Sequence, residues 1–144
     1  MIKNGKGVTL IELVIVLALL SFVMMIGFSV FSFGFKSFNT QTKNIDNQSN
    51  VRYAIGFITK EVRKAEWNNI TVAESKKEIK INDVTYKLDT GSHVIKKGES
   101  QLVMNIGDFY VDKDKDDTEI TLIITSLTNT SGRAVTLTSK IYHR

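Results

Sequence analysis

The chain has 144 residues, enough for one domain, and it contains no cysteine and no proline. The absence of cysteine excludes disulfides, thiolate metal sites and a cysteine nucleophile. The formal net charge of +4, half of it from Lys3 and Lys6, is too small to indicate a nucleic-acid partner.

An uncharged apolar segment lies close to the N-terminus. It extends from Leu13 to Phe35, which is 23 residues without Asp, Glu, Lys or Arg. As a helix it would be about 35 Å long, and about 20 residues span a hydrocarbon core of about 30 Å. Three serines inside it can hydrogen-bond back to the helix backbone: Ser21, Ser29 and Ser32. The segment is therefore long enough to cross a membrane.

The flanks of this segment differ from those of a secretory signal. Such a signal has an apolar region of roughly 7–15 residues followed by a small-residue cleavage site. Here the run is longer, and the small residue, Gly7, lies before it. Lys3 and Lys6 also precede it, and positive flanks stay in the cytoplasm. We therefore expect the N-terminus inside and the C-terminal domain outside the cytoplasmic membrane.

Glu12 places a carboxylate at the mouth of the apolar segment. An ionisable residue near a membrane span indicates a functional role, with a partner to be named. The alternative is that Glu12 only marks the helix N-terminus, where a carboxylate interacts favourably with the macrodipole.

Residues 7–13, Gly-Val-Thr-Leu-Ile-Glu-Leu, resemble the processing motif of type IV prepilins and pseudopilins. That family has a short basic leader ending in Gly and a mature helix with Glu at its fifth position. The first mature residue is most often Phe, and here it would be Val8. The resemblance implies a leader at 1–7, cleavage between Gly7 and Val8 by a membrane prepilin peptidase, and N-methylation of Val8.

The resemblance also implies that residues 8–35 form the transmembrane and assembly helix, with Thr9, Leu10, Ile11 and Glu12 at its start. Glu12 would pair with the terminal amine of a neighbouring subunit. At about 4 Å and an effective dielectric constant of about 20 the attraction is near 4 kcal/mol before desolvation. Such a pair fixes register more surely than it adds stability.

Helix weakening on assembly stays open, because the proline that many family members carry in this segment is missing. Gly27 and Gly34 are the candidate weak points, each costing about 1 kcal/mol relative to Ala.

The remainder, 36–144, is expected to form a globular domain. Five apolar residues recur at helical spacing on one stripe: Val51, Ile55, Ile58, Val62 and Ala65. Lys60 and Lys64 fall on the other side. An amphipathic helix over 36–67 follows, so that one long helix would run from Thr9 to Glu66.

After Asn69 the pattern changes to short strand-like runs, which make 70–144 β-rich. The expected strands are Glu78–Ile81, Val84–Leu88, His93–Ile95, Leu102–Ile106, Phe109–Val111, Glu119–Leu127 and Ala134–Tyr142. Short connections predict an antiparallel sheet. The fold class is α+β, a long helix packed on an antiparallel sheet, as in the pilin fold.

A weaker resemblance extends into the domain. Residues 51–54 and 58–65 resemble the helix of minor pilins of the W type and pseudopilins of the J type, and 86–88 with 94–98 resemble their central hairpin. This implies a low-copy subunit that primes the fibre or sits at its tip. Without cysteine, the last strand would be held by strand pairing alone.

The acidic run 112–117 raises the question of calcium. An EF-hand needs Gly at the sixth position and Glu at the twelfth, and Asp117 and Ile123 stand there. A different calcium loop using Asp112, Asp114 and Asp116 is the alternative to a solvated loop. No other metal or cofactor is expected.

Catalytic constellations are missing from the sequence. His93 and His143 have no Ser-Asp or metal-ligand partners at suitable spacing, and there is no phosphate-binding loop. We therefore expect no enzyme activity. Arg52, Lys60, Arg63 and Lys64 form a basic cluster that either touches DNA in a competence pseudopilus or is a solvated helix face.

Three hypotheses follow. The first is a minor pilin or pseudopilin that acts by polymerising with other pilin subunits, first in the cytoplasmic membrane and then in a surface pilus or pseudopilus. The second is a fibre subunit that presents its domain to DNA, a surface or a secreted substrate. The third is an ordinary membrane-anchored enzyme or receptor. Pilus, type II secretion and competence machines share the N-terminal motif.

Overall fold

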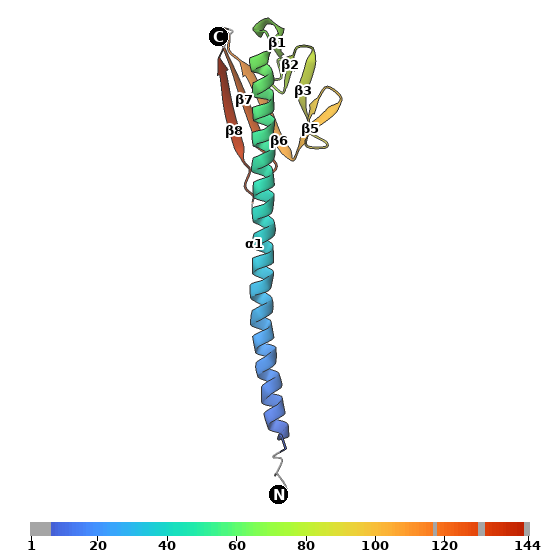
Figure 1. Cartoon of the computed structure of the whole chain (residues 1–144), viewed down its shortest axis with the longest axis vertical. Coiled ribbons are helices and arrows are strands. Elements are labelled where there is room, and N and C mark those ends of the chain that lie inside the picture. Colours follow the sequence, from blue (N-terminus) through green and yellow to red (C-terminus); the bar gives the residue numbers. More distant parts are fainter. Residues whose placement is uncertain (1–6, 117, 130–131, 143–144) are drawn as a thin grey trace. The chain divides into compact units, whose positions relative to one another are not determined.

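The computed structural model describes residues 7–116, 118–129 and 132–142. Most of the leader with Lys3 and Lys6, as well as Asp117 and His143, lies outside the described residues. The chain divides into two compact units, one up to Asn39 and one from Thr40 onward. Helix α1 (Leu10–Lys64) contributes residues to both (Figure 1).

Two antiparallel sheets follow α1 in the second unit, after a 3₁₀ turn, η1 (Trp67–Asn69). The five-stranded sheet has the order β1-β2-β3-β4-β5, with β1 (Ile70–Val72), β2 (Glu78–Ile81), β3 (Val84–Asp89), β4 (Val94–Lys97) and β5 (Ser100–Met104). The three-stranded sheet has the order β6-β7-β8, with β6 (Ile106–Lys113), β7 (Glu119–Ser126) and β8 (Thr136–Tyr142).

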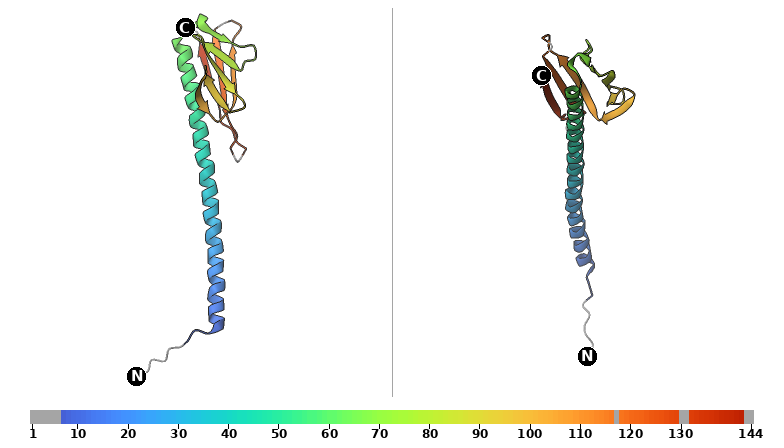
Figure 2. Two further views of the ribbon diagram at one scale, coloured as in Figure 1. Left: turned by 90° about the vertical axis from the view of Figure 1, so that its right-hand side faces the viewer. Right: turned by 45° about the horizontal axis from the view of Figure 1, so that its top comes forward.

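The helical part of the second unit buries one stripe. Val51, Ile58 and Val62 are buried, and Ile55 and Ala65 are half-buried against the same core, which confirms the expected amphipathic pattern. Lys60 and Lys64 are exposed. Within this unit both sheets lie on the same side of α1 (Figure 2).

One continuous core joins this stripe to both sheets. From the five-stranded sheet it takes Ile70, Ile79, Ile81, Tyr86, Ile95 and Val103, and from the three-stranded sheet Ile106, Phe109, Val111, Ile120, Leu122, Ile124 and Ile141. Fully burying one such side chain contributes about 1.5–3 kcal/mol. The α+β class with a long helix on antiparallel strands is therefore confirmed.

The single sheet expected from the sequence is wrong. Asn105 adopts a left-handed conformation with φ of 64°, which ends β5 and lets Ile106 begin β6 as the first strand of a second sheet. Leu102–Ile106 is therefore not one strand. Helix α1 begins at Leu10 and ends at Lys64, one residue after and two residues before the expected bounds.

The hairpin joining β2 and β3 turns at Asn82 and Asp83. Asn82 and Asp83 have φ values of 45° and 66°, the pair of positive angles that a two-residue type I′ turn requires. Strand β1 was not expected, because a three-residue run after the helix carries no recognisable alternation.

Strand β8 is held by more than strand pairing, which corrects the expectation from the missing cysteines. The Thr59 hydroxyl of α1 donates to Ser139 Oγ at 3.1 Å. Asn47, only 8% exposed, donates from Nδ2 to the Leu127 carbonyl at 3.0 Å. Asn129 Nδ2 donates to Asn44 Oδ1. The β7–β8 connection is therefore tied to the helix through side chains.

Gly107 and Gly56 provide a test of this packing. A Cβ at Gly107, in the β-bulge of β6, would lie 2.8 Å from the Ser126 carbonyl oxygen, whereas a Cβ at Gly56 in α1 meets nothing within 4 Å. We expect Gly107→Ala to destabilise the domain by about 1–3 kcal/mol through overpacking. Gly56→Ala should stabilise it by about 0.5–1 kcal/mol through helix propensity. Denaturant unfolding in micelles, followed by Trp67 fluorescence, measures both, and equal stability of the two variants would contradict the packing at the bulge.

Candidate functional site

In the described part of the first unit, the large apolar side chains are more than half exposed. The large apolar side chains from Val8 to Phe38 are between 51% and 82% exposed. By length and composition α1 can cross a membrane, and none of its most apolar stretch is buried within the chain. Since each such side chain gains roughly 1.5–3 kcal/mol on leaving water, this surface needs lipid or other helices around it.

Two serines inside this stretch hydrogen-bond to the backbone of the helix itself. Ser21 donates its hydroxyl to the Leu17 carbonyl at 2.8 Å, and Ser29 donates to the Met25 carbonyl at 2.9 Å. Both contacts confirm the expected back-bonding. Gly27 and Gly34 lie within a continuous helix.

Thr9 and Glu12 form the start of α1. Thr9 directly precedes the first helical residue, and its hydroxyl oxygen accepts the Glu12 backbone N–H at 3.3 Å. The Thr9 hydroxyl also lies 3.5 Å from Glu12 Oε2. This is the Thr-x-x-Glu pattern of a capping box, with Leu10 and Ile11 between the two polar residues. The Glu12 carboxylate is exposed in the first turn, where the helix dipole favours a negative charge.

The acidic run does not gather around a common point. Asp112 Oδ1 lies 2.9 Å from Lys76 Nζ in an ion pair. Asp114 accepts the Lys115 backbone N–H at 2.8 Å, and Asp116 is exposed. Among the described residues no group of three or more His, Asp or Glu could hold a metal ion.

The basic cluster on α1 is exposed. Arg52, Lys60, Arg63 and Lys64 all lie on the surface, and Lys64 Nζ is 3.7 Å from Glu61 Oε1. His93 is exposed too, at a turn with φ of 56°.

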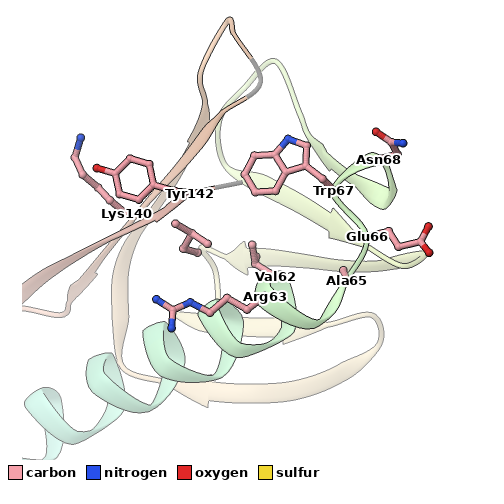
Figure 3. Close-up of a pocket in the computed structure, with 9 residues that line it drawn as sticks. Val62, Arg63, Ala65, Glu66, Trp67, Asn68, Lys140 and Tyr142 are labelled. Carbon is pink, nitrogen blue, oxygen red and sulfur yellow. The ribbon is translucent and has the colours of Figure 1, made fainter. Parts of the chain in front are cut away.

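The second unit contains a cavity that was not predicted from the sequence. It has a volume of about 760 Å³ and lies between the last turn of α1, η1 and the end of β8. Its lining residues are Val62, Arg63, Ala65, Glu66, Trp67, Asn68, Lys140, Ile141 and Tyr142 (Figure 3). The only signal in the sequence was a single Trp at the end of the helical pattern.

The capping geometry at Thr9 gives a testable outcome. Thr9→Ala removes the acceptor for the Glu12 N–H and should weaken the first turn by about 1 kcal/mol. Amide hydrogen exchange at Ile11 and Glu12, measured in micelles, should become about fivefold faster. Thr9→Ser keeps the oxygen and serves as the control, and unchanged exchange in Thr9→Ala would contradict the cap.

The N-terminal part of the chain matches a known family model. Residues 2–28 match the model of the prokaryotic N-terminal methylation motif. No curated protein and no solved structure matched the chain. The match includes Gly7, Val8 and Glu12 and continues into the exposed apolar part of α1. The chain therefore carries an N-terminal methylation motif, which supports a type IV pilin-like, membrane-associated subunit.

Proposed function

We propose that the chain is a prepilin that is cleaved between Gly7 and Val8, N-methylated on Val8 and assembled through its N-terminal helix. One observation carries the proposal. The methylation motif over residues 2–28 leads directly into a helix with exposed apolar side chains and a carboxylate, Glu12, in its first turn.

Cleavage at this position creates the partner that Glu12 needs. The new amine at Val8 is a cation at the end of an apolar helix, and Glu12 is the only acidic residue between it and Phe35. In a core of packed helices, the amine of one subunit and the carboxylate of the next attract by about 4 kcal/mol before desolvation. The pair sets the axial register, while Leu10 and Ile11 pack around it and Thr9 caps the helix.

The proposed role is structural. The subunit is first held in the cytoplasmic membrane with its C-terminal domain outside. The pilus or pseudopilus assembly machinery then transfers its helix from lipid into the fibre. The subclass proposed here is a minor pilin of the W type or a pseudopilin of the J type, which primes or tips the fibre. The resemblance of residues 51–54, 58–65, 86–88 and 94–98 to that subclass supports this part of the proposal.

The Glu12 role can be separated from simple helix capping. Glu12→Gln keeps the capping pattern, which accepts Glu or Gln, and removes the charge. In the producing cells we expect this variant to be processed normally while its share in the sheared fibre fraction falls at least tenfold. Because the ion pair is lost, crosslinks from a photoreactive amino acid at position 20 to neighbouring subunits should fall equally.

The matched control is Thr9→Ala, which weakens the cap and keeps the charge. It should assemble nearly as well as the unaltered chain. If Glu12→Gln assembled normally, or if Thr9→Ala failed to the same degree, Glu12 would be only a helix-capping residue and the pairing mechanism would be refuted.

A further inference from the structure

The cavity at the end of α1 is suited to a small ligand. Its volume of about 760 Å³ lies within the range of roughly 300–1,000 Å³ that small-molecule sites occupy. All its lining residues belong to the unit that starts at Thr40. The cavity is therefore independent of the processing motif and of the membrane helix.

Two aromatic rings and one guanidinium group dominate the cavity. Figure 3 shows the Trp67 indole and the Tyr142 ring on opposite sides of the space, with the Arg63 side chain below them. Val62, Ala65 and Ile141 add apolar surface to the lining. Flat aromatic faces pack against the apolar face of a ring, and a guanidinium group binds a carboxylate with two parallel hydrogen bonds.

The charges around the cavity favour a ligand with few negative charges. Lys140 Nζ lies 2.8 Å from Glu119 Oε1, and this contact raises the pKa of Lys140 and lowers that of Glu119. Glu66 adds a carboxylate to the lining. Among the described residues Arg63 makes no ion pair. Nucleic acid, whose affinity depends on several phosphate contacts with cations, fits this arrangement poorly.

We propose that this cavity binds a carboxylated sugar, such as a uronic acid unit of an acidic polysaccharide. The carboxylate bonds to Arg63, and the ring lies between Trp67 and Tyr142. The assignment goes beyond the assembly role, since it gives the fibre subunit a ligand of its own.

Trp67 makes the test direct, because it is the only tryptophan in the chain. The full chain, unassembled in detergent micelles, is titrated with trigalacturonate while Trp67 fluorescence is recorded. We expect a saturable change, and at least tenfold weaker binding of the fully methyl-esterified trisaccharide, because a hydrogen bond to a charged group is lost. The assay needs no peptidase and no fibre, so it can fail while the prepilin proposal stands.

Arg63→Gln should weaken trigalacturonate binding at least tenfold. The control is Arg52, an exposed arginine of the same helix that lies outside the cavity, and Arg52→Gln should leave the binding unchanged. Both variants change surface side chains, and near-ultraviolet circular dichroism checks that each is folded. Three results would overturn the proposal: no saturable change, equal loss in both arginine variants, or equal binding of the acid and its ester. Tighter binding of single-stranded DNA with the same Arg63 dependence would also overturn it, in favour of a nucleic-acid site.

Discussion

The exposed apolar surface from Leu13 to Phe35 is the constraint on which the rest of the molecule depends. These side chains are mostly exposed in the isolated chain, and each would cost roughly 1.5–3 kcal/mol to leave in water. The chain must therefore keep this surface in lipid or among other helices of the same kind. A subunit that moves from the membrane into a fibre satisfies the requirement in both states. In the proposed assembly, the Glu12 carboxylate at the start of that surface pairs with the terminal amine of a cleaved neighbour.

After Thr40 the same helix is amphipathic, with one face buried and the others exposed. There only one stripe, from Asn47 to Val62, is buried, and the polar residues on the other faces of the helix are exposed to water. The β7–β8 connection is tied to this part of α1 by Asn44 and Asn47. These amide hydrogen bonds hold the connection in place in a chain that has no cysteine.

Local patterns predicted much of the fold because they record burial directly. The 3.6-residue period over 51–65 and the alternation from Ile120 to Ile124 each reflect one buried face. Asn82 and Asp83 lie between two strand-like runs, and both residue types tolerate the positive φ that their turn requires. The processing motif was recognisable because its spacing is local, and the family-model match over 2–28 supports the class.

Features that depend on distant segments were not predictable in this way. The break into two sheets depends on the backbone conformation of Asn105. The spacing of apolar residues in the sequence does not indicate that conformation. The cavity draws its walls from the end of α1 and from β8, so that Trp67 and Tyr142 had no visible relation in the sequence. The contact between Asn47 and Leu127 is hidden for the same reason.

The most direct test of the central claim is the mass and N-terminal sequence of the membrane-extracted protein, produced together with an active prepilin peptidase. The account predicts a chain that begins at Val8 and carries one added methyl group. A chain that still begins at Met1, in cells where a known prepilin is cleaved, would contradict it and leave a domain on an ordinary membrane anchor.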